Sequence, residues 1–268
     1  MPSINESWYE ELWKLIKSVK ERELNLFSAG SMMSLCINLA ESKEAVKRKR
    51  EILELLVRAS KEQGQYVAEK AQELLTSLRN YFENIHYETI YVEAELTSRG
   101  IFGVSEIFGV TLFEVGMYFD PYLNLPVIPA SSIKGAIKAA YEDLFPERNE
   151  EIKRLFGSKE EQGICIFTDA YPVRPGERGY VLYPDVMTPH YKGDVLSELE
   201  AEPTPIQYIS IAPKTLFGFI IAIKRNISGK MKRRFREALF MAIGLGLGAK
   251  TMIGYGSFRI IKFDMSGS

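Results

Sequence analysis

The 268-residue chain has only two cysteines, only two histidines and no excess of either charge. Two cysteines exclude a disulfide framework and a four-cysteine zinc site. Cys36 and Cys165 are therefore expected to be buried thiols in a reducing compartment. The formal net charge of −1 excludes a uniformly basic nucleic-acid-binding protein, so any such function must depend on local basic patches.

Long apolar runs are also missing. None reaches the roughly 18 residues of a membrane span, and the charged, amphipathic N-terminus does not resemble a signal peptide. We therefore expect a cytoplasmic protein without a membrane partner. Asp169 and Asp185 are potential metal ligands, but no cluster at ligand spacing accompanies them, so we predict neither a metal nor a cofactor.

The first part of the chain is helical by its apolar periodicity. Residues 6–85 repeat apolar side chains at helical spacing, and Gly64 is expected to break the pattern. A basic run between Lys43 and Arg50 has two open interpretations, a solvated helix face or an RNA-facing patch. We treat residues 1–85 as an N-terminal helical extension.

The periodicity changes at residue 86. Tyr87–Leu96 alternates apolar and polar residues, which is typical of a strand with one wet face. Further elements are expected in this order: a strand or hairpin arm at 110–119, a turn at 121–126, a helix from about 130, strands at 163–169 and 215–223, a helix at 231–242 and a last strand at 258–263. This order predicts an α+β, ferredoxin-like (RRM-like) domain over 86–268 with a long inserted loop at about 171–205. The open sheet of an RRM binds single-stranded RNA.

The segment Ile128-Pro-Ala-Ser-Ser-Ile-Lys-Gly135 begins the helix near residue 130. Ser131 or Ser132 is expected to cap it, and Lys134 lies in its first turn, where anions are attracted. An ordinary capped helix is the alternative. Glycine inside a helix costs roughly 1 kcal/mol relative to alanine, so Gly135 suggests close approach by another backbone.

Five glycines lie between Gly244 and Phe258, in the segment Gly-Leu-Gly-Leu-Gly-Ala-Lys-Thr-Met-Ile-Gly-Tyr-Gly-Ser-Phe. Such a turn can present backbone N–H groups to a phosphate, and Lys250 and Thr251 could add contacts. The order helix, glycines, strand excludes a P-loop and a Rossmann fingerprint. The alternative is a helix C-cap followed by a glycine-bulged strand.

Three segments together resemble the RAMP proteins of type III CRISPR effectors, over roughly residues 98–260. They are the segment from Ile128 to Gly135, the glycine-rich stretch from Gly244, and Asp185-Val-Met-Thr-Pro-His-Tyr191 followed by Pro203-Thr-Pro205. The third is most similar to the sixth-subunit family of the type III-B Cmr complex. Ala130 departs from the glycine that is usual in the first motif, and residues 99–109 follow the family only loosely.

This resemblance implies a non-catalytic subunit of an RNA-guided antiviral ribonucleoprotein. Its partners would be CRISPR RNA, near the 3′ end, target RNA and sister RAMP subunits of the Cmr complex. Hydroxyls, glycine backbone and cations contact phosphate rather than base edges, so binding would be largely independent of sequence. The predicted RNA-binding residues are Ser131, Ser132, Lys134, Gly135, Arg233, Arg234, Gly246, Gly248, Lys250, Thr251 and Gly254.

Two alternatives stay open. His190, beside Tyr191 and Lys192 in the inserted loop, could act as the general base of a RAMP endoribonuclease, or it could hold the loop by hydrogen bonds. The chain could also be a protein-only adaptor. These alternatives separate on one point, because an RNA groove is excluded if Lys134 and Lys250 are buried in ion pairs.

Overall fold

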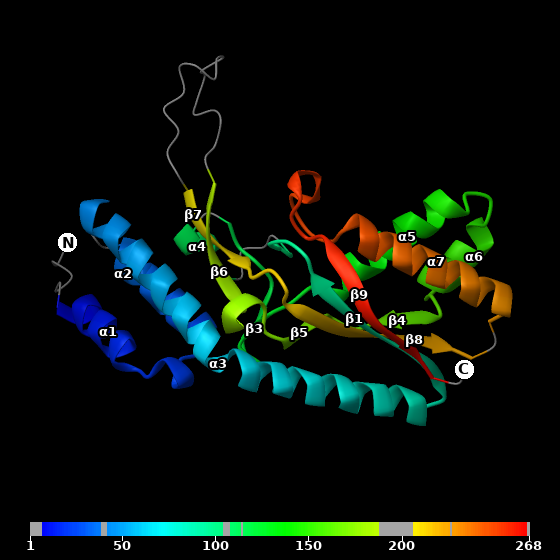
Figure 1. The fold of residues 1–268 in the computed structure, drawn as a ribbon, viewed down its shortest axis with the longest axis horizontal. Helices are drawn as coiled ribbons and strands as arrows, with labels where there is room; N and C mark the ends of the chain where they lie inside the picture. Colours follow the sequence, from blue (N-terminus) through cyan, green and yellow to red (C-terminus); the bar gives the residue numbers. More distant parts are fainter. Residues whose placement is uncertain are drawn as a thin grey trace, which may run out of the picture.

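The structure is a computed structural model that describes residues 7–38, 42–103, 108–113, 115–187, 206–225 and 227–266. The helices α1 and α2 lie at one end of the molecule, α5, α6 and α7 lie at the other, and a sheet runs between them (Figure 1). The helices are α1 (Ser7–Ser18), α2 (Leu26–Asn38), α3 (Ser42–Asn84), α4 (Val110–Phe113), α5 (Ala130–Leu144), α6 (Asn149–Phe156) and α7 (Gly229–Leu245), with short 3-10 turns η1 (Glu21–Glu23), η2 (Glu177–Gly179) and η4 (Thr251–Ile253). The strands are β1 (Tyr87–Leu96), β2 (Phe119–Asp120), β3 (Leu125–Pro126), β4 (Cys165–Phe167), β5 (Tyr171–Arg174), β6 (Leu182–Met187), β7 (Ile206–Ile211), β8 (Leu216–Lys224) and β9 (Phe258–Met265).

The central sheet has the strand order β4-β8-β1-β9, with β5 also paired to β8, and every pairing is antiparallel. The elements β1, α5, β4, β8, α7 and β9 follow one another as two split βαβ units, which is the ferredoxin-like arrangement. The predicted fold class is therefore confirmed. The strand predicted at 87–96 has the same bounds in the structure.

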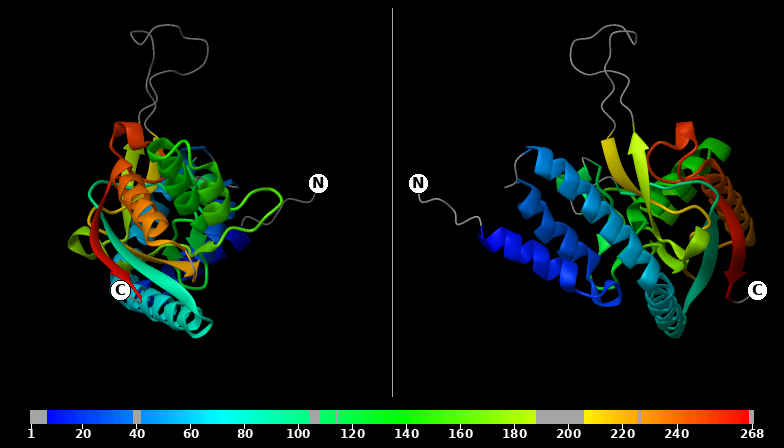
Figure 2. Two further views of the ribbon diagram at one scale, coloured as in Figure 1. Left: turned by 90° about the vertical axis from the view of Figure 1, so that its right-hand side faces the viewer. Right: turned by 60° about the vertical axis from the view of Figure 1, so that its left-hand side comes forward.

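Helices cover both faces of this sheet, in contrast to the open sheet face with which an RRM binds RNA. On one face, Ile90, Val92 and Ala94 of β1 share a core with α5 and α7. On the other face, Tyr91 shares a core with Leu75 of α3. The alternation of β1 sends successive side chains to opposite faces, and the set that faces α3 is buried at Thr89 and Tyr91 and half-buried at its other positions. Figure 2 shows α3 alongside the sheet in two further views.

The helix break that we predicted at Gly64 is absent, and α3 continues through this residue. A Cβ at this buried position would lie 3.1 Å from the carbonyl oxygen of Gly179 and 3.4 Å from Cβ of Pro175. Gly64 therefore allows the η2 turn to approach a continuous helix. Within the basic run of α3, Arg48 is 5% exposed and pairs with Glu44, so it belongs to the interior rather than to a solvated or RNA-facing surface.

Two stretches that we predicted to be extended or irregular have a different secondary structure. The strand or hairpin arm predicted at 110–119 contains the short helix α4 and ends in β2. Its side chains Leu112, Phe113, Met117 and Phe119 are all buried, and the spacing of its apolar residues does not distinguish a short helix from a strand. The stretch 171–205 contains β5, η2 and β6, and β6 pairs with β7 in an antiparallel hairpin. Residues 188–205 lie outside the described residues.

Helix α3 contributes Leu56, in its first half, to a core that it shares with the β6–β7 hairpin, and Leu75, in its second half, to a core that it shares with the central sheet. The boundary at residue 85 between a helical extension and a RAMP domain stays a prediction. In the part of the chain that the structure describes, no helix is both long enough and apolar enough to cross a membrane. Helix α3 has 43 residues but is rich in charged side chains.

Candidate nucleic-acid interface

The N-terminus of α5 is held by a carboxylate rather than by a serine. The N-cap is Pro129, neither Ser131 nor Ser132 caps the helix, and the backbone N–H of Ala130 donates to Oδ1 of Asp169 at 2.6 Å. A negative charge at a helix N-terminus stabilises the helix and occupies the place where an anion would bind. The predicted caps are therefore wrong. An RNA phosphate here would have to use side chains, of which that of Ser131 is exposed.

Lys134 and Gly135 follow one turn later. Lys134 is half-buried and makes no ion pair with any described residue. Gly135 is exposed, and a Cβ built on it would meet no atom within 4 Å. The expected close approach of another backbone is therefore absent from the described part of the chain, and this face of α5 is open.

The charge of Lys134 acts on the thiol of Cys165 in β4. Burial raises the pKa of Cys165 to about 12, and the nearby ammonium group of Lys134 opposes this only in part. Burial dominates because a thiolate loses its hydration in the core. Cys165 is therefore a structural thiol, as the sequence predicted, and not a nucleophile.

We expect the Cys165 thiol of a Cys36→Ser variant to resist a thiol-specific reagent at about pH 8.5 in the folded chain and to react in urea. The pKa of this thiol is higher in the folded chain than in the unfolded chain, so its contribution to stability is complete below pH 9.0 and is lost as the pH rises toward about 12. Urea titrations at increasing alkaline pH test this sign. Rapid modification of the folded chain would contradict the burial of the thiol.

The glycine-rich stretch closes α7 and turns back into β9. Helix α7 ends at a C-cap, Gly246, with φ of 96°. A Cβ on Gly248 would lie 2.4 Å from the carbonyl oxygen of Ile101, and one on Gly256 would lie 1.9 Å from that of Leu247. Both glycines have positive φ, a conformation that other residues rarely adopt. They let two backbone segments pass at close range.

Most backbone N–H groups of this stretch are already used inside the chain. Leu247 donates to Gly256, Ala249 donates to Ile101, and Gly256 donates to the carbonyl oxygen of Arg99. The expectation that the glycines present a row of N–H groups to phosphate is therefore wrong for these positions. The alternative interpretation, a helix C-cap that leads into the last strand, describes the backbone better.

What the stretch does present is its tip, the turn η4. Thr251 is half-buried, and Gly254, with φ of 91°, has no atom within 4 Å of a built Cβ. Met252 and Ile253 at this tip are 97% and 71% exposed. The backbone of Lys250 has φ of 61°, which is unusual for a residue with a side chain and indicates that tertiary contacts hold it.

Sequence reasoning missed the network that anchors this tip. Asp185 of β6 is 4% exposed and accepts hydrogen bonds from Arg99 at 2.5 Å and from the Tyr255 hydroxyl at 2.8 Å. The Tyr255 and Tyr208 hydroxyls lie 2.9 Å apart, and burial holds the pKa of Tyr208 well above its usual range. The ammonium group of Lys250 lies 4.9 Å from the centre of the Tyr208 ring. The one sequence signal for this network was that Asp185 belongs to a segment that carries the family resemblance.

The two motifs lie toward the same end of the sheet. Strands β1 and β4 are both antiparallel to β8, so they run in the same direction and end on the same side. Asp169, which holds α5, follows β4, and Phe258, which ends the glycine-rich stretch, pairs with Leu96 at the end of β1. Helices α5 and α7 pack side by side between these points. The serines at the start of α5 and the glycine-rich tip therefore lie toward the same end of the sheet, and Lys134 follows within the first turn of α5.

Arg233 and Arg234 lie elsewhere. They are in the N-terminal half of α7, and the turns that separate them from the glycine-rich tip span about 18 Å at 1.5 Å per residue. Arg234 forms a bidentate ion pair with Glu151 of α6, and the Arg234 side chain is 19% exposed. Arg233 is 76% exposed and pairs with Glu237. His190 lies outside the described residues, and in the described part no group of acidic, histidine or cysteine side chains could hold a metal ion.

Comparisons with known proteins agree with this architecture. Residues 77–259 match the RAMP superfamily. The chain is 39% identical over 217 residues to a Saccharolobus solfataricus protein named CRISPR system CMR subunit Cmr6, which covers 81% of this chain and 72% of the relative. A Pyrococcus furiosus protein named CRISPR system Cmr subunit Cmr6 is 30% identical over 132 residues, 46% of this chain and 37% of the relative.

One solved structure matches nearly the whole molecule. A chain in the cryo-EM structure of the type III-B Cmr-beta complex bound to cognate target RNA has a TM-score of 0.81 and 32% sequence identity, and the match covers 96% of this chain and 97% of that chain. The match therefore includes the N-terminal helices. The predicted family is confirmed: this chain belongs to the RAMP superfamily and is a homologue of the Cmr6 subunit of type III-B CRISPR systems.

Proposed function

We propose that this protein is a non-catalytic RNA-binding subunit of a type III-B Cmr effector complex in antiviral defence. It binds near the 3′ end of the CRISPR RNA, beside sister RAMP subunits, and supports recognition of target RNA in the cytoplasm. The observation that carries the proposal is the match over nearly the full chain to a subunit of a Cmr complex that holds target RNA.

The RNA contact surface that we propose lies beyond the ends of β1 and β4. It combines Ser131, Ser132, Lys134 and Gly135 of α5 with Gly246, Gly248, Lys250, Thr251 and Gly254 of the glycine-rich stretch. The open surface at Gly135 and the absence of a described ion-pair partner for Lys134 support the α5 part. Cations and hydroxyls contact phosphate without reading sequence. We leave Arg234 out of this surface because Glu151 holds its guanidinium group.

Two alternatives have specific tests. A RAMP endoribonuclease would lose activity in a His190→Ala variant, whereas our proposal expects target-RNA cleavage by the assembled complex to stay within about twofold. A protein-only adaptor would have both Lys134 and Lys250 buried in ion pairs, whereas Lys134 pairs with no described residue and Lys250 is only half-buried, with its ammonium group over the Tyr208 ring. The position of Lys134 on an open helix face favours RNA contact over the adaptor.

The experiment that tests RNA binding is a salt series with the purified chain and a single-stranded RNA, followed by gel analysis for cut products. We expect log Kd to depend linearly on log salt concentration, and each lost phosphate contact to reduce the slope by about 0.7. Lys134→Glu should lower both affinity and slope. Lys14→Glu, the same charge change on an exposed residue of α1, should leave both unchanged.

Three outcomes would contradict the proposal. Cleaved RNA in the gel analysis would indicate that the chain is a nuclease. Equal affinity and slope for Lys134→Glu and Lys14→Glu would remove α5 from the interface. If the isolated chain does not bind RNA, the salt series is replaced by nuclease protection of CRISPR RNA in the assembled complex. Unchanged protection with Lys134→Glu would then contradict the assignment of α5 to the RNA contact surface.

A further inference from the structure

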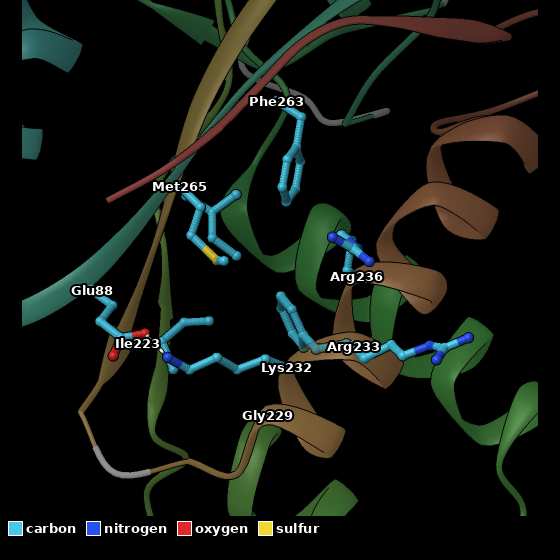
Figure 3. Close-up of a pocket in the computed structure, with 10 residues that line it drawn as sticks. Glu88, Ile223, Gly229, Lys232, Arg233, Arg236, Phe263 and Met265 are labelled. Atoms are coloured by element: carbon cyan, nitrogen blue, oxygen red, sulfur yellow. Dashed lines mark hydrogen bonds and ion pairs between the residues drawn. The ribbon is translucent and has the colours of Figure 1, made fainter. Parts of the chain in front are cut away.

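A cavity of about 260 Å³ lies at the opposite end of α7 from the glycine-rich tip, between that helix and strands β1, β8 and β9 (Figure 3). Its floor is formed by the buried side chains of Ile90, Ile223 and Phe235. Phe263 and Met265 of β9 line one side, and Gly229 lies at the start of the helix on the other. The interior of the cavity is therefore apolar.

The rim of this cavity, in contrast, is cationic. Arg233, which pairs with Glu237, and Arg236 of α7 lie along it, and Arg236 is exposed and has no acidic partner among the described residues. Lys232 pairs with Glu88, the only carboxylate among the lining residues. The N-terminus of α7 adds a partial positive charge. Exposed cations continue the surface along the chain at Lys224, Arg225 and Lys230.

The size and chemistry of the cavity restrict its occupant. Small-molecule sites usually measure about 300–1,000 Å³ and contain polar groups that orient the ligand. This cavity is smaller, and its only polar pair, Glu88 with Lys232, is already satisfied. A nucleobase is recognised through hydrogen bonds to its edges, and Ile90, Ile223 and Phe235 offer none. A single bulky apolar side chain fits these conditions.

We propose that this cavity is a docking site for an acidic segment of a neighbouring protein subunit, which inserts one bulky apolar side chain between α7 and β9. Apolar anchors that fill a pocket contribute most of the energy of protein interfaces, and complementary charge at the rim speeds and selects the encounter. Strand β9 is the last strand of the sheet, so an extended segment can also lie along its edge. That the segment comes from a sister subunit rests on the function proposed above.

The test uses the full chain and three labelled probes: a short peptide with one phenylalanine among glutamates and aspartates, the same peptide with serine for phenylalanine, and a single-stranded RNA of similar length. Fluorescence anisotropy gives each affinity. Arg236→Glu reverses the rim charge. Gly229→Leu places a bulky side chain at an exposed lining position where a Cβ meets no atom within 4 Å, so we expect it to obstruct the cavity without a clash at Cβ.

We expect the phenylalanine peptide to bind the parent chain, and either variant to weaken it about tenfold, a change of about 1.4 kcal/mol. Lys14→Glu, on an exposed position of α1 at the far end of the molecule, should change it less than twofold (Figure 1). The serine peptide should bind much more weakly than the phenylalanine peptide. The proposal is overturned if the parent chain does not bind the peptide, if serine replaces phenylalanine without loss, or if all variants bind alike.

The RNA probe separates this proposal from the proposed function. Gly229→Leu should leave RNA affinity unchanged, and a loss of RNA affinity without loss of peptide affinity would make the cavity an RNA site instead. A chain that binds the peptide but no RNA would overturn the RNA-binding function alone. In a reconstituted Cmr complex, Arg236→Glu should reduce co-purification of this chain with its sister subunits, and full incorporation of both variants would contradict the docking site.

Discussion

Replacing Gly256 by alanine is expected to lower the free energy of unfolding by about 3 kcal/mol, because the new methyl group cannot be accommodated by a side-chain shift. A Cβ at this position would lie 1.9 Å from the carbonyl oxygen of Leu247, which is backbone. The φ of 66° adds about 1 kcal/mol for a residue other than glycine. Relief of the clash breaks the hydrogen bonds of Gly256 with Leu247 and Arg99, worth about 1 kcal/mol each.

Gly244→Ala is the matched control for Gly256→Ala. Gly244 lies in the last turn of α7, has no atom within 4 Å of a built Cβ and does not have positive φ. Alanine there should raise the free energy of unfolding by about 0.5 kcal/mol. Urea denaturation measures both variants. If the two substitutions have equal effects, the close backbone crossing at Gly256 is not present in solution.

The same pair of variants links stability to RNA binding. Gly256→Ala should displace the tip that carries Lys250 and Thr251, so RNA affinity should fall even at temperatures where the chain remains folded. Gly244→Ala should retain the affinity of the parent chain. Retained RNA affinity in a Gly256→Ala chain with a displaced tip would place the RNA contacts outside the glycine-rich stretch.

Asp185→Ala is expected to destabilise the chain by about 2–4 kcal/mol, the second large effect. The carboxylate is buried and accepts hydrogen bonds from Arg99 and Tyr255, and removal of one member of a buried pair leaves the other without its partner. We take a value below that of a fully buried pair because the Arg99 side chain is 41% exposed and water can replace part of the interaction.

Asp143→Ala provides the comparison for Asp185→Ala. Asp143 is exposed on α5 and should change stability by less than about 0.5 kcal/mol. Asp185→Ala should also loosen the tip of the glycine-rich stretch, because Tyr255 joins the two, and hydrogen exchange of the amides around residues 250–256 reports this directly. Unchanged exchange in a destabilised Asp185→Ala chain would mean that the carboxylate supports the β6–β7 hairpin alone.

The fold was largely predictable where the residues of a single helix or strand produce its hydrophobic periodicity. The alternation of Tyr87–Leu96 and the apolar face of α5 are local signals, and the structure has both elements. Gly64 was misjudged because its role depends on the η2 turn, more than a hundred residues later in the chain. The caps expected at Ser131 and Ser132 failed for the same reason, since the competing carboxylate, Asp169, follows a different strand.

The candidate site was predictable in its parts but not in its assembly. Sequence patterns singled out Lys134, Lys250 and Arg233 as cations of one surface, but they carry no information on which ends of α5 and α7 meet. The antiparallel register of β1, β4 and β8 brings the first two to one end of the sheet and leaves Arg233 at the other. Asp185 and Arg99 are 86 residues apart, so only the folded chain reveals their pairing.

The sequence by itself determined the family, the ferredoxin-like order of strands and helices, and the two motifs that mark the proposed RNA surface, because periodicity and glycine spacing act over short distances. Only the tertiary structure decided that α3 covers the second face of the sheet, that the glycines serve a backbone crossing, and that an apolar cavity with a cationic rim lies at the far end of α7. These features depend on burial and on contacts between segments distant in the chain, and burial is a property of the assembled fold.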